Sequence, residues 1–175
     1  MAPPPYSNDN APRVGKGMMI AAWALLLGLL TWFFADLEKQ QSNPNSRPQS
    51  RTDERGRPEV VLQRNRYGHY VASGKINHKP VIFLLDTGAT SVAVPQSVAK
   101  RLNLHRGAPR QVNTANGVVT AYDTQLDSVQ LGNIVLEQVR GVITPNMQSN
   151  EILLGMSFLK RLEFTQRGDI LILRH

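Results

Sequence analysis

The sequence predicts an all-β domain, a small barrel with one or two short helices, preceded by a single transmembrane helix. Three observations indicate this. From Val60 to the C-terminus, short apolar segments alternate with turn-forming residues, which is typical of small barrels and sandwiches. An uncharged apolar run lies near the N-terminus, and almost nothing apolar lies between that run and Val60. A chain of 175 residues therefore fits one folded domain with an appendage.

Residues 1–17 contain four prolines and several small polar residues, so they predict a disordered tail. Residues 18–35 carry no charge and, as a helix, span about 28 Å when Gly17 is included, close to the ~30 Å hydrocarbon core of a bilayer. A cleaved signal peptide fits less well, because no small-x-small site follows the run. A buried core helix is also disfavoured, because the run has no polar stripe. We expect an uncleaved membrane anchor.

The flanking charges favour one orientation of this anchor. Lys16 lies nearest its N-terminal end, whereas Asp36 and Glu38 flank the other end. Because basic residues favour the cytoplasmic side, we expect a single-pass protein of the inner (cytoplasmic) membrane with its C-terminal domain in the periplasm.

Residues 36–59 are polar and rich in Pro, Asn, Ser and Arg. With so little apolar surface, they cannot offset the entropy of ordering, and they predict a flexible linker to a domain over residues 60–175.

The composition excludes several functions. The net charge is +7, but acids and bases are interspersed and aromatic residues are only 6% of the chain, which disfavours nucleic-acid binding and favours an anionic membrane surface as the use of the excess charge. The absence of cysteine excludes disulfides, thiolate zinc sites and a cysteine nucleophile. The four histidines lack metal-ligand spacing. We expect neither a metal nor a cofactor.

Strand and helix signals follow one another through the domain. Pro95 suits the first turn of a short helix with one apolar side over 96–104. The Asn116-Gly117 pair between alternating segments predicts a hairpin. A further helical turn is expected over 158–162. The predicted strands are 70–76, 81–85, 92–94, 125–131, 134–144, 152–154, 163–166 and 170–173.

The chain is organised around the stretch from Val81 to Ser91. Five apolar residues, 81–85, predict a strand buried on both faces, and such a strand ends in an acid only when the carboxylate has a use. That acid is Asp86. Gly88 lets the backbone turn sharply and lets its N–H approach the carboxylate. The sequence thus places a carboxylate at the end of a rigid strand.

The residues 84–91, Leu-Leu-Asp-Thr-Gly-Ala-Thr-Ser, resemble the active-site loop of the retropepsin-like aspartic peptidases. A second segment, 152–159, resembles the apolar-apolar-Gly strand that packs beside this loop in that family. The likeness covers roughly residues 65–175, and the membrane-anchored bacterial single-domain group is the nearest match. It implies a retropepsin-like acid-protease barrel and an aspartic endopeptidase with a protein or peptide substrate.

Hydrolysis by carboxylates needs two of them sharing one proton: one acts as base toward a water while its protonated partner polarises the scissile carbonyl. The chain carries one Asp-Thr-Gly. Its other acids lie in polar or turn contexts (Asp123, Asp127, Glu151 and Asp169). The second carboxylate therefore has to come from a second copy, which predicts a two-fold homodimer with an Asp86 dyad.

The resemblance also implies roles for the surrounding residues. Thr87 would bond across the two-fold axis and Gly88 would donate its N–H to the dyad. Ala89 would contact the substrate backbone, while Leu154 and Gly155 would pack behind the loop. Asn116 and Gly117 would form the tip of a flap that closes over the peptide.

The sequence departs from the retroviral pattern at two places. Only Gly117 matches the glycine-rich flap. Met156-Ser157 stand where the retroviral type has Arg followed by an acid or amide, so a different brace within the protomer is implied.

Other functions stay open. Residues 155–159 are one glycine short of a nucleophile elbow, which disfavours a serine hydrolase. The main alternative is a catalytically inactive module of the same fold that binds a peptide or partner. A third possibility is an anchored structural protein in which Asp86 only caps a turn.

Overall fold

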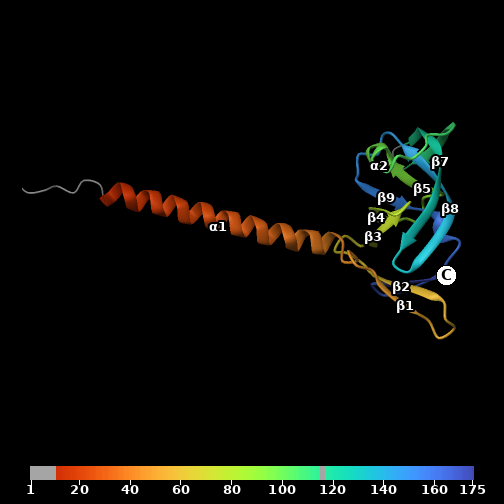
Figure 1. Cartoon of the computed structure of the whole chain (residues 1–175), viewed down its shortest axis with the longest axis horizontal. Coiled ribbons are helices and arrows are strands. Elements are labelled where there is room, and N and C mark those ends of the chain that lie inside the picture. Colours follow the sequence, from red (N-terminus) through yellow and green to blue (C-terminus); the bar gives the residue numbers. More distant parts are fainter. Residues whose placement is uncertain (1–10, 115–116) are drawn as a thin grey trace, which may run out of the picture. The chain divides into compact units, whose positions relative to one another are not determined.

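The computed structural model describes residues 11–114 and 117–175 (Figure 1). The chain divides into two compact units at Lys39/Gln40.

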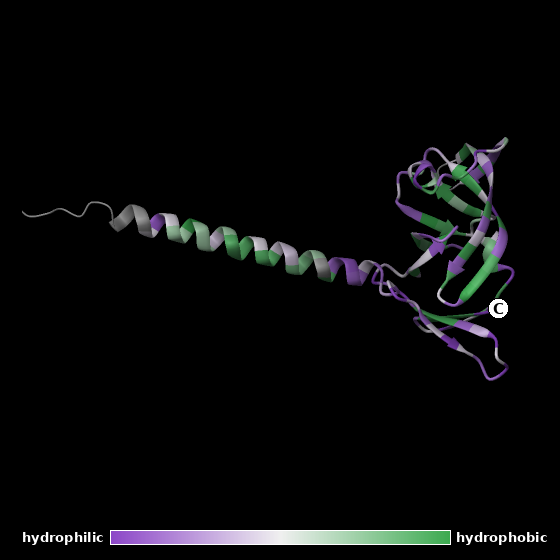
Figure 2. Cartoon of the chain, in the orientation of Figure 1, coloured by the Kyte–Doolittle hydropathy of each residue, from purple (hydrophilic) through white to green (hydrophobic). Residues whose placement is uncertain are grey.

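Helix α1, Ala11–Ser42, begins before the predicted anchor and continues beyond it, and its residues up to Lys39 belong to the first unit. Its large apolar side chains between Met18 and Phe34, such as Trp23 and Leu27, are exposed. Figure 2 shows the apolar run along the helix and the hydrophilic residues that follow it. The segment Gly15–Ser42 is long and apolar enough to cross a membrane.

The second unit begins earlier than predicted. The sequence predicts a flexible linker over 36–59, but the structure differs: α1 continues to Ser42, and Gln49–Thr52 forms strand β1 against β2, Pro58–Gln63. Asn45 is buried and holds this segment in place. Its Nδ2 donates to the carbonyls of Gln63 and Val71, and its Oδ1 accepts from the Gln63 N–H at 2.7 Å. The segment is ordered by backbone pairing and by the hydrogen bonds of one buried amide. A prediction from the number of apolar residues detects neither of these.

A four-stranded antiparallel sheet has the order β1-β2-β11-β10. β10 spans Glu163–Arg167 and β11 spans Ile170–Arg174, so the two ends of the domain meet in one sheet. Glu59 of β2 is buried in it between two arginines, with Arg174 at 2.5 Å and Arg51 also hydrogen-bonded. Burial alone would raise the pKa of Glu59, but the hydrogen bonds from these guanidinium groups outweigh it and lower the pKa.

The remaining strands form a seven-stranded sheet of order β3-β4-β9-β5-β8-β7-β6. β3 also pairs with β7, which closes the sheet into a barrel and confirms the predicted all-β class. Pairs β4–β9 and β5–β8 are parallel. The bounds are β3 Val71–Ile76, β4 Lys79–Leu85, β5 Val92–Pro95, β6 Pro109–Thr114, β7 Gly117–Leu131, β8 Ile134–Thr144 and β9 Glu151–Leu154.

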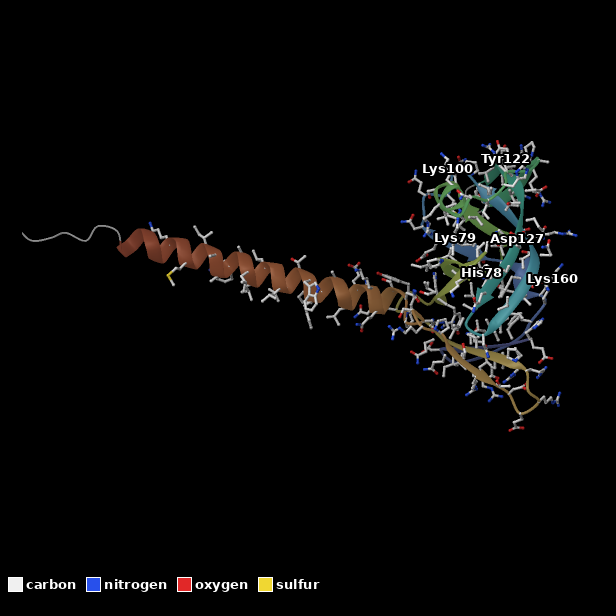
Figure 3. All side chains as sticks on the ribbon, viewed as in Figure 1. His78, Lys79, Lys100, Tyr122, Asp127 and Lys160 are labelled. Atoms are coloured by element: carbon white, nitrogen blue, oxygen red, sulfur yellow. The ribbon has the colours of Figure 1, made fainter. Side chains whose placement is uncertain are left out.

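Two short helices complete the domain. α2, Gln96–Leu102, starts after Pro95 as predicted, and it ends two residues early because Asn103 adopts a left-handed conformation with φ 58°. α3, Met156–Leu159, lies slightly before the predicted helical turn. The core inside the barrel is apolar, and its largest fully buried side chains include Phe83, Leu126, Ile143, Ile152, Leu154 and Phe158. Charged side chains such as Lys100, Asp127 and Lys160 lie on the outside (Figure 3).

Candidate functional site

Asp86 follows directly after β4, and β4 lies between β3 and β9. Its backbone N–H donates to the Leu154 carbonyl of β9 at 3.3 Å, which continues the parallel pairing of Leu85 with Leu154. The Asp86 side chain is half-buried. The carboxylate is therefore fixed by two neighbouring strands, as the sequence predicts, and it still has access to solvent.

The turn after Asp86 holds its carboxylate. The Gly88 N–H donates to Oδ1 of Asp86 at 2.8 Å, and the Ala89 N–H donates to the Asp86 carbonyl at 3.3 Å. A Cβ at position 88 would lie 3.1 Å from Oδ1, which is tighter than ordinary contact. The predicted approach of the Gly88 N–H to the carboxylate is present in the structure.

Leu154 and Gly155 lie behind this loop, where the resemblance places them. Leu154 is fully buried. A Cβ at Gly155 would lie 2.6 Å from the Ala89 carbonyl oxygen and closer still to that of Ser91. Directly beyond Gly155, the Met156 N–H donates to the Ala89 carbonyl at 2.8 Å. Only glycine allows the two segments to approach this closely.

Ser157 is a site-supporting residue that the sequence reasoning did not assign. Its backbone N–H donates to the Thr90 carbonyl at 3.0 Å, and its hydroxyl accepts from the Val92 N–H at 3.0 Å. The hydroxyl then donates to the Arg140 carbonyl of β8 at 2.7 Å. This is the different brace that Met156-Ser157 implied. A small hydroxyl residue after an apolar-apolar-Gly segment was the only signal for it.

A cleft of about 850 Å³ opens beside Asp86. The loop residues Gly88, Ala89 and Thr90 line it together with Asp86. Strand ends and the β6–β7 hairpin provide the other walls, and the lining there mixes apolar and uncharged polar side chains with one arginine: Ser91, Ala93, Arg110, Gln111, Val112, Asn113, Thr114, Val119, Val142, Thr144, Asn146, Met147 and Leu153.

The hairpin over the cleft differs in register from the prediction. β6 pairs with β7 so that Thr114 opposes Gly117. Gly117, with φ 102°, is thus the first residue of a strand rather than a central residue of the turn. Asn116 lies outside the described residues. Neither Gly117 nor Thr87 lines the cleft, and both are exposed.

The acid and base groups in the cleft are few. Among the described residues that line it, Asp86 is the one carboxylate, and the one cation, Arg110, pairs with Asp123 at 3.2 Å. Within residues 11–114 and 117–175, no three His, Cys, Asp or Glu side chains gather as a metal site would require. In this part of the chain the carboxylate therefore has no second acid beside it in the cleft.

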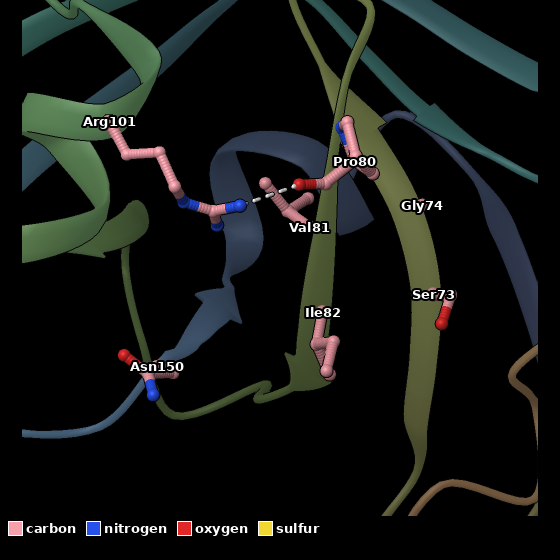
Figure 4. A pocket seen from close by; sticks show the side chains of 7 residues that line it. All are labelled: Ser73, Gly74, Pro80, Val81, Ile82, Arg101 and Asn150. Atoms are coloured by element: carbon pink, nitrogen blue, oxygen red, sulfur yellow. Dashed lines mark hydrogen bonds between the residues drawn. The ribbon is translucent and has the colours of Figure 1, made fainter.

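A second cavity, of about 480 Å³, lies over β3 and β4 (Figure 4). Arg101 reaches the Pro80 carbonyl there at 3.4 Å, and the other lining residues include Ser73, Ile82 and Asn150. Its described lining includes no carboxylate, so it lacks the group that acid–base chemistry of the predicted kind needs.

Comparison with known proteins matches these features to one family. Residues 72–161 match the family model described as "gag-polyprotein putative aspartyl protease". The crystal structure of a retropepsin-like aspartic protease from Rickettsia conorii superposes with a TM-score of 0.59 at 28% identity, covering 74% of this chain and 96% of that one. The likeness confirms the retropepsin-like fold.

Two curated relatives are similar over most of this chain. An uncharacterised protein from the cobV 5′ region of Sinorhizobium sp is 34% identical over 130 residues, which is 70% of this chain and 54% of that protein. An uncharacterised protein of Rickettsia prowazekii (strain Madrid E) is 30% identical over 122 residues, 67% of this chain and 52% of that protein. The chain thus spans about half the length of these curated relatives. With the matched model covering residues 72–161 and the fold of a retropepsin-like protease around Asp86-Thr87-Gly88, the chain belongs to the retropepsin-like aspartic peptidases.

Proposed function

We propose that the protein is a membrane-anchored aspartic endopeptidase that hydrolyses peptide bonds through a water activated by two Asp86 carboxylates, one from each protomer of a homodimer. The observation that carries the proposal is the single carboxylate at the end of β4. It is half-buried, faces a cleft, and is held by the Gly88 N–H.

One carboxylate cannot be base and acid in the same step. In a dyad, the ionised group takes a proton from water while the protonated group donates a hydrogen bond to the scissile carbonyl. Because like charges a few ångströms apart cannot both ionise, the pair shares one proton. A two-fold axis beside Asp86 supplies this arrangement from identical chains. In it, Thr87 bonds to the partner loop across the axis.

The cleft suits an extended peptide. Its lining of Ala93, Val112, Val142 and Leu153 accommodates apolar side chains, while the backbone of Gly88 and Ala89 offers hydrogen bonds to a peptide main chain. The β6–β7 hairpin, with Gly117 at the start of β7, acts as the flap over the bound peptide.

Helix α1 anchors the enzyme in the inner membrane, with the domain in the periplasm. Its exposed apolar surface over residues 18–34 supports membrane insertion, and Lys16 at one end against Asp36 and Glu38 at the other supports the orientation. Since the chain has no cysteine, a single Lys160→Cys variant can be labelled in intact cells with a membrane-impermeant maleimide once the outer membrane is permeabilised. Labelling without lysis of the inner membrane supports the periplasmic side.

A mixing experiment tests the dyad. Full-length wild type and Asp86→Asn are co-expressed in equal amounts, purified together in detergent and assayed on an unfolded protein at mildly acidic pH. If each active site needs two Asp86 groups, only the wild-type homodimers are active, and the mixture should show about a quarter of the activity of the same amount of wild type. If each chain acts alone, the mixture should show about half of that activity. Asp86→Asn alone is expected to be inactive.

Two results would count against the proposal. Cleavage by Asp86→Asn alone, or activity linear in the wild-type fraction, contradicts it. Binding of a peptide by the wild type with no cleavage points to the alternative, a retropepsin-fold module that recognises peptides without cutting them.

A further inference from the structure

The end of the four-stranded sheet that receives the chain from α1 collects arginines. In this antiparallel sheet, the start of β1, the end of β2, the start of β11 and the end of β10 share one end. The segments at this end, 43–48, 64–70 and 167–169, contribute four arginines and one acid: Arg47, Arg64, Arg66, Arg167 and Asp169. The turn at the opposite end, 53–57, is balanced, with two acids and two arginines.

The loop 64–70 is built rigidly around Asn65. The Asn65 Oδ1 accepts from the N–H groups of Tyr67 and His69 at 3.0 and 2.9 Å, and the Asn65 N–H donates to the His69 carbonyl at 2.8 Å. Because the loop is closed by these bonds, its side chains are presented in a fixed arrangement that costs little entropy to bind.

Within this loop, Arg66 and Tyr67 form one exposed unit. The Arg66 guanidinium lies 4.6 Å from the centre of the Tyr67 ring and is also hydrogen-bonded to the Tyr67 hydroxyl. Tyr67 is 59% exposed, so much of its ring faces solvent. A cation and an amphipathic ring presented together are what a bilayer interface accepts.

The same loop is bonded to the last residues of the helix that leads out of the apolar run. Arg66 donates to Oε1 of Gln41 at 2.7 Å, and the Asn65 Nδ2 donates to the Ser42 carbonyl at 3.0 Å. Gln41 and Ser42 belong to the same compact unit as the loop. Along α1, Gln41 follows Phe34 by seven residues, or at most about 10 Å.

That distance decides which partner fits. The polar headgroup layer extends roughly 5–8 Å beyond each side of the hydrocarbon core, and its potential reaches a further Debye length of about 8 Å. Because Gln41, to which Arg66 is hydrogen-bonded, follows Phe34 by only seven residues, the chain itself limits how far this loop can lie from the headgroups when residues 18–34 span the bilayer. Asp36, Glu38 and Lys39 of α1 lie in the same zone and leave the arginines in excess.

We propose that Arg47, Arg66, Tyr67 and Arg167 form a docking surface for anionic phospholipid headgroups, called here the headgroup surface. It rests on the membrane anchoring in the proposed function and is independent of the proteolysis. Each arginine near an anionic surface favours docking by roughly fivefold, so the three together favour it on the order of a hundredfold. Docking of this kind would restrict how the domain moves on its anchor.

The test uses the full chain, which has no cysteine, in lipid nanodiscs of phosphatidylcholine with 0–50% phosphatidylglycerol. An environment-sensitive fluorophore is attached to His69→Cys in the loop 64–70. For comparison, a second sample carries it on Asp127→Cys, an exposed position of β7. We expect the emission at position 69 to shift to the blue, and brominated lipids to quench it, as phosphatidylglycerol rises. At 0.5 M salt the effect should largely disappear, because exposed charges are screened.

The variant R47Q/R66Q/R167Q is expected to raise the phosphatidylglycerol fraction needed for half of the shift beyond the range tested. The matched control R55Q/K100Q/K160Q removes the same charge from exposed positions elsewhere and should behave as wild type. Resistance of every sample to alkaline extraction from liposomes establishes insertion separately. Two results overturn the headgroup surface: an inserted chain whose position 69 responds equally to both lipids, or a control variant that loses as much of the shift as R47Q/R66Q/R167Q does. Failure of the chain to insert overturns the membrane anchor instead.

Discussion

The hydroxyl of Ser157 accepts a hydrogen bond from the backbone N–H of Val92 at 3.0 Å, and so joins α3 to the strand that leaves the Asp86 loop. The same hydroxyl donates to the Arg140 carbonyl of β8. One small side chain therefore connects three segments behind the Asp86 loop.

Ser157→Ala is expected to destabilise the domain by about 1–3 kcal/mol, because it leaves the Val92 N–H without its partner. The loop carrying Asp86 should loosen as well, so kcat should fall more than KM rises. Thermal unfolding and peptidase kinetics measure the two effects. Ser97→Ala, at an exposed position on α2, is the control and should change neither by much. Equal behaviour of the two variants would show that the brace has no role.

Gly155→Ala tests the close packing behind the loop. The added Cβ would meet the Ala89 and Ser91 carbonyl oxygens, so the loop must move or β9 must shift. We expect a loss of about 2–4 kcal/mol, in the range of damaging core substitutions, and a loss of activity at temperatures where the variant stays folded. Gly68→Ala has a positive φ of 84° but open space around it, so it should cost only roughly 1–2 kcal/mol. Chemical denaturation compares the two, and a smaller loss for Gly155→Ala would contradict the packing described.

Asn45→Ala tests the ordered segment between α1 and β2. It removes three hydrogen bonds made by one buried side chain and leaves the Gln63 N–H unpaired. A destabilisation of about 2–4 kcal/mol is expected. Hydrogen exchange should show faster exchange in β1. Asn133→Ala, which removes one exposed bond to the Arg51 carbonyl, is the matched control and should cost under about 1 kcal/mol. Unchanged protection of β1 would show that Asn45 does not hold this segment in place.

The pH dependence of stability should report Glu59. Burial raises the pKa of Glu59, but the hydrogen bonds from Arg51 and Arg174 lower it by more than burial raises it. The folded-state pKa therefore lies below the unfolded value of about 4.3. The folded state then binds fewer protons than the unfolded state. The stabilisation that ionised Glu59 contributes is fully present above the unfolded pKa and is lost as the pH falls through the folded pKa.

Urea denaturation of wild type and Glu59→Gln between pH 7 and pH 3 isolates this effect. The difference in unfolding free energy between the two should be largest near neutral pH and shrink as the solution is acidified below the unfolded pKa. A difference that stays constant over the whole range would show that the pKa of Glu59 is the same in the folded and the unfolded protein, and would contradict the lowered pKa.

The sequence predicted the parts of the fold that depend on apolar pattern and turn chemistry. The strand before Asp86 and the strand 152–154 are both present. The prediction that residues 81–85 are buried on both faces is wrong, because Val81 and Phe83 face the core whereas Ile82 is exposed. The helix after Pro95 starts as expected. The prediction of a flexible linker over 36–59 was wrong because this segment is ordered by polar hydrogen bonds. The residues around Asn45 contain little that is apolar and are held by the Asn45 amide and by backbone pairing.

The candidate site follows the same division. Asp86, Gly88 and Gly155 could be found because an acid directly after an apolar strand is unexpected unless it is used, and because glycine is needed where backbones approach closely. Ser157 could not, because a serine hydroxyl bonding two backbone groups looks in sequence like any surface serine. The register at Gly117 was missed because a shift of one residue moves the turn without changing the Asn-Gly signal.

The distance between the two Asp86 carboxylates in the assembled protein tests the central claim most directly. A crystal structure of the full-length dimer in detergent should place their oxygens about 3 Å apart across a two-fold axis, close enough to share one proton. Two carboxylates on separate surfaces of the assembly, or a protein that is monomeric while it cleaves peptides, would contradict a shared catalytic pair.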